Sequence, residues 1–138
     1  MKIERITQID PILELIPIEQ QIRNKNREAM RIGDMLLLVK ESLDNPLFGF
    51  WIAYDKDKVV GYLGAIASMV KNLKRIIVWR IYAPEKDVQE KFKDVLTEFG
   101  KGFKIKPGVV RMEVFKHDRV LERKGWKPVS RIMEKRLY

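Results

Sequence analysis

Two apolar runs separated by a short polar segment lie in the middle of the chain. Residues Phe48 to Tyr54 are almost all apolar or aromatic, and so are residues Val59 to Ile66. The segment between them, Asp55 to Lys58, consists of charged side chains. Runs of this length, rich in aromatic and β-branched residues and joined by a polar turn, predict a hairpin of two well-buried strands.

A third strand and an amphipathic helix are predicted after this hairpin. Residues Ile76 to Tyr82 predict a strand that ends before Pro84, with successive side chains on opposite faces of a sheet. One face would carry Ile76, Val78, Arg80 and Tyr82, and the other Ile77, Trp79 and Ile81. An apolar stripe at helical spacing follows, with Gly100 and Gly102 beyond its end. The members of the stripe are Val88, Phe92, Val95, Leu96 and Phe99.

The N-terminal part of the chain predicts a short strand followed by a helix. Ile3 and Ile6 suggest the strand. Asp10 and Pro11 predict the start of a helix. Aspartate can cap the free N–H groups of the first turn, and the N–H that proline lacks would have no partner within the helix at that position. We expect Pro17 to interrupt or kink this helix.

The remaining elements complete the predicted order. We expect Gly33 to end the first helix and Asp34 to cap a second one, from Met35 to about Leu43. Near the C-terminus the pattern predicts a strand at Val109 to Phe115, a short helix at Asp118 to Lys124 and a strand at Arg131 to Leu137. This order favours an α+β fold in three layers, with a mixed, mostly antiparallel central sheet and helices on both faces. Residues 1–138 are expected to form a single domain.

Composition narrows the classes of protein. The chain has 138 residues, 46% hydrophobic and 34% charged, as in an ordinary soluble domain. It has no cysteine and one histidine, His117, which excludes disulfide scaffolds and thiol nucleophiles and argues against a histidine-based metal site. We find no run of about 20 apolar residues for a membrane span and no secretory signal, so we expect a cytoplasmic protein. The net charge of +9 indicates either an anionic partner such as nucleic acid or a cofactor phosphate, or a lysine-rich solvated surface.

Three short segments carry a resemblance to a known family. In Asp57 to Leu63, a polar turn leads into an apolar strand that contains Gly61. In Ile81 to Pro84, a strand ends in proline before a helix, and in Arg119 to Trp126 a short basic helix ends in a Gly-aromatic pair. Together and in this order, the segments resemble the GNAT superfamily of acyl-CoA N-acyltransferases over nearly the whole chain. Bacteriophage-encoded members often have a similar Arg/Trp-rich version of the last segment.

The resemblance implies an N-acetyltransferase that moves an acetyl group from acetyl-CoA to a primary amine. It implies that the strand end, Ile81, Tyr82 and Ala83, splays from its neighbour and hydrogen-bonds the pantetheine arm. The start of the next helix would hold the pyrophosphate. Further cofactor-binding positions are Val88, Gln89, Lys91, Arg119 and Arg123. The two arginines would equally fit a solvated basic helix face or contacts with nucleic acid.

The expected phosphate-binding loop departs from the family pattern. Family members usually have Arg/Gln-x-x-Gly-x-Gly/Ala, and the corresponding positions here are Asp87, Glu90 and Phe92. Glycine lets a phosphate approach the backbone closely, so Phe92 would add bulk, although it also fits the apolar stripe of the helix. Asp87 and Glu90 have the spacing of a capping box, so the two carboxylates would occupy the N–H groups that a phosphate would use.

The proton donor for the CoA thiolate also departs from the family pattern. Members often have a tyrosine four residues before the C-terminal glycine, where this chain has Leu121. Tyr82 is the first substitute, because a phenol at the strand end can donate a proton; it would also fit as an aromatic residue packed against a helix. His117 could relay a proton at neutral pH or be an inert loop side chain.

Two hypotheses follow from these features. The first is an acetyl-CoA-dependent N-acetyltransferase whose acceptor the sequence does not identify. The second is a GNAT-like module without CoA binding that has a structural or nucleic-acid-associated role, as the basic charge and the altered loop suggest.

Overall fold

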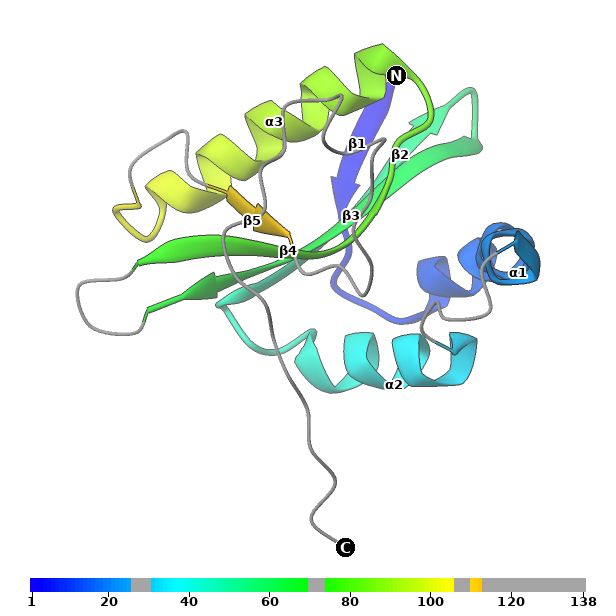
Figure 1. The fold of residues 1–138 in the computed structure, drawn as a ribbon, viewed down its shortest axis with the longest axis horizontal. Coiled ribbons are helices and arrows are strands. Elements are labelled where there is room, and N and C mark those ends of the chain that lie inside the picture. The colour runs from blue at the N-terminus through cyan, green and yellow to red at the C-terminus, as the bar shows by residue number, and fades with distance from the viewer. Residues whose placement is uncertain (26–30, 70–73, 106–109, 113–138) are drawn as a thin grey trace, which may run out of the picture.

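The computed structural model describes residues 1–25, 31–69, 74–105 and 110–112, and it places five strands in one sheet of order β1-β2-β3-β4-β5. Helices precede the second strand and follow the fourth, in the order that the sequence predicts (Figure 1). The elements are β1 (Lys2–Arg5), the 3-10 helix η1 (Asp10–Leu15), α1 (Ile16–Lys25), α2 (Ile32–Ser42), β2 (Phe48–Asp55), β3 (Lys58–Ser68), β4 (Arg75–Tyr82), α3 (Lys86–Lys101) and β5 (Val110–Met112).

Among the described strands, the sheet is antiparallel from β1 to β4, and the pairing of β4 with β5 is parallel. The hairpin of β2 and β3 turns at Lys56 and Asp57, both of which have positive φ. The parallel pair follows from the connection through α3, because two parallel neighbouring strands need a long crossover. Within the described residues, this pairing runs from Ile76–Val110 to Val78–Met112.

Helices cover both faces of the sheet (Figure 1). α3 lies on one face, whereas η1, α1 and α2 lie on the other. On the α3 face the buried core consists of Trp51, Ala53, Leu63, Ala65, Ala67, Ile76, Val78, Val88, Phe92, Leu96, Phe99 and Ile105. On the opposite face it consists of Ile6, Ile12, Leu15, Met35, Val39, Phe48, Phe50, Ile52 and Tyr62. The predicted α+β architecture in three layers is confirmed.

The predicted alternation of β4 is wrong in its second half, because the strand contains a bulge. Gly64 of β3 lies opposite Arg80, but the next residue, Ala65, lies opposite Val78, which leaves Trp79 unpaired. Trp79 is half-buried and packs against the core on the face that α1 and α2 cover. Arg80 and Tyr82 therefore lie on that face and not with Ile76 and Val78.

Gly64 makes room for this bulge. A Cβ atom at Gly64 would lie 2.4 Å from the indole of Trp79, closer than any real contact. The absence of a side chain thus allows the indole to lie directly over β3. No periodicity in the sequence indicates that a glycine in β3 leaves room for a tryptophan in β4.

Helix starts in the N-terminal part differ from the predictions. The chain from Asp10 is a 3-10 helix, with Ile9 at its cap position, and it becomes α-helical at Ile16, so that Pro17 lies in the first turn of α1. Proline is tolerated there because the first N–H groups of a helix have no partner within it.

The second helix, α2, begins earlier than predicted. Its N-cap is Arg31 and it runs from Ile32, so Gly33 does not end a helix and Asp34 does not cap one. Asp34 lies in the first turn, where the positive end of the helix dipole favours a carboxylate. α3, by contrast, covers the predicted stripe and has Gly102 at its C-cap, as expected, although Gly100, which was predicted to lie beyond the helix, is in its last turn.

β5 lies inside the strand predicted at Val109 to Phe115. The helix predicted at Asp118 to Lys124 and the strand predicted at Arg131 to Leu137 lie outside the described residues. Of the helices that the structure describes, none has the length and apolar character to cross a bilayer.

Candidate functional site

The end of β4 and the start of α3 bring most of the predicted site residues together. Ile81, Tyr82 and Ala83 are all half-buried, and the exposed segment from Pro84 to Asp87 follows them. The side chain of Gln89 folds back and donates from Nε2 to the carbonyl oxygen of Ala83, at 2.8 Å. The first turn of α3 is thereby fixed against the end of the strand.

Gly61 of β3 lies directly against this junction. A Cβ atom at Gly61 would lie 2.7 Å from the carbonyl oxygen of Tyr82 and 2.7 Å from Cγ1 of Val88. Any other residue would push the strand end and the helix apart. The glycine of the segment from Asp57 to Leu63 therefore has a structural reason that does not depend on the family resemblance.

The N-terminus of α3 is capped differently from the prediction. Glu85 occupies the N-cap position without a side-chain cap, so Asp87 and Glu90 do not form a capping box. Asp87 Oδ1 nevertheless accepts a hydrogen bond from the backbone N–H of Val88, at 3.0 Å. Glu90 instead pairs with Lys93 Nζ at 3.1 Å. One carboxylate thus occupies a donor at the positive end of the helix, and the other does not.

Phe92 does not occupy the space in front of this helix end. Its side chain is 1% exposed and belongs to the core between α3 and the sheet, where Cε2 would lie 3.3 Å from a Cβ at Gly61. The bulk at this position is therefore directed toward the sheet. Of the two interpretations of Phe92, the core position is the correct one.

Tyr82 lies on the opposite face of the sheet from α3. Its ring stacks on the ring of Tyr62, its register partner in β3, with centroids 5.3 Å apart. The phenol is half-buried at the strand end. This packing fits the structural role considered for Tyr82, but it places the side chain against β3 and not against α3.

A buried polar triad that the sequence patterns did not suggest lies beside Tyr82. Glu19 of α1 is 2% exposed, and both of its oxygens are bound by the guanidinium of Arg80, with Nε at 2.9 Å from Oε1. The hydroxyl of the fully buried Tyr62 donates to Oε1 of the same carboxylate. Burial, followed by the neighbouring Glu19 carboxylate, raises the pKa of Tyr62 above its usual range, so the phenol remains the proton donor of this hydrogen bond.

One signal in the sequence could have indicated this triad. Glu19 follows Ile12 and Leu15 at helical spacing, on the face of the segment that turns inward. A carboxylate on an apolar face needs a buried partner, because an unpaired buried charge is costly. The partner, however, is 61 residues away, and only the bulge places it on the correct face.

Of the remaining predicted residues, only Lys91 lies in the described part of the chain. Lys91 is exposed on α3, one turn beyond Asp87. His117, Arg119 and Arg123 lie outside the described residues, so their predicted roles remain predictions.

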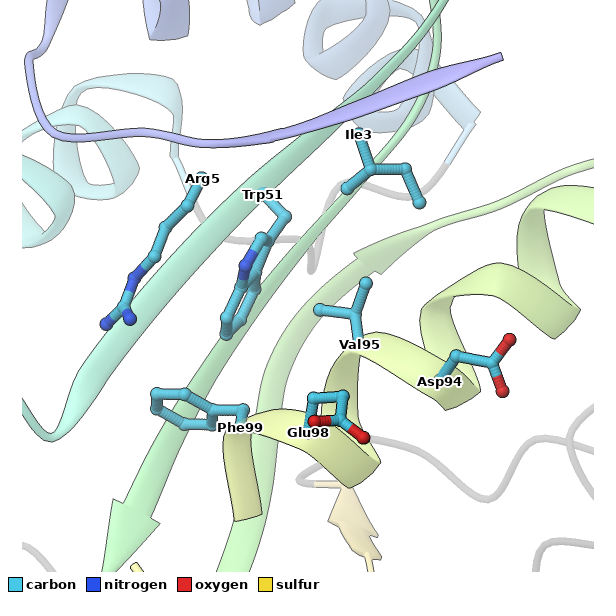
Figure 2. Close-up of a pocket in the computed structure, with 7 residues that line it drawn as sticks. All are labelled: Ile3, Arg5, Trp51, Asp94, Val95, Glu98 and Phe99. Atoms are coloured by element: carbon cyan, nitrogen blue, oxygen red, sulfur yellow. The ribbon is translucent and has the colours of Figure 1, made fainter. Parts of the chain in front are cut away.

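A separate shallow pocket of about 520 Å³ lies between β1, β2 and α3 (Figure 2). Arg5 lies over the rings of Trp51 and Phe99, at 5.5 and 5.3 Å from their centroids, and donates to the carbonyl oxygen of Phe48 at 2.9 Å. In Figure 2 the carboxylate of Asp94 lies on the side away from Arg5. None of the predicted site residues lines this pocket, so it is distinct from the candidate site.

Comparison with known proteins identifies the fold through structure alone. No family model matches the sequence, and a search of curated proteins finds no significant match. A predicted acetyltransferase from Clostridium acetobutylicum, solved with acetyl-CoA, is 14% identical with a TM-score of 0.71, and the match covers 99% of this chain and 96% of that one.

Two further structures extend the same similarity. An aminoglycoside N-acetyltransferase in complex with CoA is 10% identical, with a TM-score of 0.67 and 99% of both chains covered. A ribosomal-protein-alanine N-acetyltransferase from Brucella melitensis is 14% identical, with a TM-score of 0.63 and coverage of 99% and 98%. At these identities, the similarity establishes the fold of the chain.

Proposed function

We propose that this protein, which has the fold of the GNAT acetyltransferases, transfers an acetyl group from acetyl-CoA to a primary amine. The observation that carries the proposal is the match of nearly the whole chain to acetyltransferases solved with acetyl-CoA or CoA. The junction of β4 and α3 adds support, because the end of the strand lies there beside the positive end of a long helix.

In the proposed complex, backbone groups of Ile81, Tyr82 and Ala83 bind the pantetheine arm. The exposed start of α3 faces the pyrophosphate, where Val88 and Gln89 lie in its first turns and Lys91 supplies a positive charge. Arg119 and Arg123 are proposed as further phosphate contacts on the basis of the family resemblance. This arrangement relies on backbone groups, which the altered loop sequence does not remove.

The proposed reaction needs few side chains. The amine nitrogen of the acceptor attacks the thioester carbonyl carbon, a C–N bond forms, and the C–S bond breaks as CoA leaves. The amine releases one proton and the CoA thiolate takes one up. Tyr82 is the proposed donor to the thiolate because its phenol lies at the strand end, and His117 is the second candidate.

Ligand-dependent stability provides the first test. We expect acetyl-CoA to raise the melting temperature, because a ligand at 100 times its dissociation constant stabilises the folded state by about 2.7 kcal/mol. ATP serves as the matched control, since a chain of net charge +9 could bind any polyphosphate. No shift with acetyl-CoA would sink the proposed cofactor, and equal shifts with both ligands would reduce it to anion binding.

Release of free CoA then tests the transfer itself. The protein has no cysteine, so a thiol-reactive dye would report CoA without any background from the chain. A panel of amines should include an aminoglycoside and a peptide with a free N-terminus. Binding of acetyl-CoA without thiol release on any amine would leave the transfer unsupported.

One observation favours the alternative, a module that has lost CoA binding. The carboxylate of Asp87 holds a backbone N–H at the end of α3, where a pyrophosphate would otherwise bind. If such a module binds nucleic acid, its affinity should fall steeply with salt, because binding releases condensed counterions. Absence of binding at low salt would remove the nucleic-acid role.

The effect of this carboxylate on the cofactor can be measured with Asp87→Asn. The substitution removes the negative charge at the positive end of α3, so we expect acetyl-CoA to bind about two- to fivefold more tightly while stability falls by about 0.3–1 kcal/mol. Calorimetric titration and chemical unfolding measure the two quantities. Asp94→Asn is the matched control, because it removes the same charge from an exposed position two turns later. A loss of stability with unchanged affinity would show that Asp87 does not limit cofactor binding.

A further inference from the structure

The helix α1 is attached to the sheet in an unusual way. Its one buried residue is a charged side chain, Glu19. The other residues of α1 are exposed or half-buried. Contact of α1 with the sheet therefore depends on what Glu19 binds, because apolar burial contributes less here than in an ordinary amphipathic helix.

Glu19 binds side chains of β3 and β4, the two strands next to the candidate site. Arg80 lies in the β4 bulge and holds both carboxylate oxygens, and Tyr62 lies in β3 and donates its hydroxyl to one of them. Arg80 is 17% exposed, and the other two side chains are almost fully buried. Bidentate arginine–carboxylate pairs have a fixed planar geometry, so this pair fixes a direction as well as a distance.

The triad lies where the bulge changes the face that the residues of β4 present. Because of the bulge, Arg80 and Tyr82 lie toward α1, while Ile81 and Ala83 pack toward α3. Tyr62 is oriented by its hydrogen bond to Glu19, and its ring in turn supports the ring of Tyr82. Both neighbours of Ile81 are thus held in place: Arg80 by the pairing of its guanidinium with Glu19, and Tyr82 by the stacking of its ring on Tyr62.

We infer that Tyr62, Glu19 and Arg80 form a positioning triad, which holds the end of β4 in the geometry that receives the acyl donor. The inference rests on the proposed function for the identity of the donor. The triad itself touches no reacting atom. Both oxygens of its carboxylate are bound and the side chain is 2% exposed, so Glu19 acts by orienting the strand and not as a base.

A paired apolar variant, Glu19→Leu with Arg80→Met, separates positioning from stability. Replacing a whole buried ion pair by apolar side chains of similar volume is often neutral, but the Tyr62 hydroxyl loses its acceptor, so we expect a melting temperature no more than about 10 °C below that of the wild type. Without the fixed direction of the ion pair, affinity for acetyl-CoA should fall by about tenfold. The matched control is Glu98→Gln with Lys101→Gln, which removes an exposed pair at the other end of α3 and should change neither quantity.

Hydrogen exchange gives a readout that needs no cofactor. We expect the backbone amides of Ile81, Tyr82 and Ala83 to exchange at least about tenfold faster in the paired variant, while amides in the β2–β3 hairpin are unchanged. If the wild type does not bind acetyl-CoA, the proposed function fails and exchange alone decides the positioning role. Wild-type exchange rates and wild-type affinity in a stable paired variant would overturn the inference.

A milder variant keeps the test decisive if the paired variant does not fold. Tyr62→Phe removes one hydroxyl and retains the ring that stacks on Tyr82. We expect the same amides to exchange faster, by about threefold, because only one of the contacts of Glu19 is lost. Unchanged exchange at all three amides would overturn the inference for Tyr62 and, in the absence of a folded paired variant, for the triad.

Discussion

Replacing Arg80 with alanine is expected to lower the free energy of unfolding by about 3–5 kcal/mol, because it leaves a buried carboxylate without its partner. Glu19 is 2% exposed, so water cannot take the place of the lost guanidinium without a local rearrangement. For a chain of this size the loss corresponds to a fall in melting temperature of about 10–15 °C. Chemical unfolding of the purified variant measures it.

The control for this prediction is Lys93→Ala. Lys93 pairs with Glu90 on the surface of α3, with both side chains more than half exposed. Exposed pairs contribute little, so stability should hardly change. If Arg80→Ala were as mild as this control, the buried pair would contribute no more than an exposed one, and its role in attaching α1 would be refuted.

Replacing Phe92 with alanine is expected to cost about 3–5 kcal/mol without any gain in acetyl-CoA binding. The ring is 1% exposed and fills the space between α3 and Gly61, so its removal leaves a cavity in the core. The expectation from the family pattern was different, since a smaller residue there would open the phosphate loop. Unfolding experiments and calorimetric titration of the same variant decide between the two.

Phe92→Leu completes this comparison. Leucine keeps most of the apolar volume, so the loss of stability should be clearly smaller than for alanine. An alanine variant that binds acetyl-CoA more tightly than the wild type would show that the ring does obstruct the loop, contrary to its position in the core.

The sequence predicted the layers of the fold better than the residues at which its helices begin. The strands β2, β3 and β4 and the stripe of α3 were found within two residues of their ends, because they bury continuous apolar surface. Helix starts were less well predicted, since Asp34 and Asp10 were assigned as caps but lie in first turns. Capping residues are also favourable one or two positions further on, so sequence alone does not fix the cap.

The candidate site was predicted only where it depends on neighbours in the sequence. Ala83 and Gln89, six residues apart, were both named, and they are joined by a hydrogen bond. The contact of Glu19 with Arg80 was missed, because it depends on a bulge that changes the face of every later side chain in β4. The predicted and observed faces of the side chains after Val78 differ because one residue, Trp79, is unpaired in the sheet.

The composition of β1 has a consequence for self-association. In the described part of the chain this strand pairs with β2 alone, so its other side is an open edge of the sheet. An open edge offers unpaired backbone groups to a second molecule and is a common route to aggregation. Three of the four residues of β1 are charged, namely Lys2, Glu4 and Arg5. Bringing another strand against this edge would require these side chains to give up water, which helps to keep the molecules apart at high concentration.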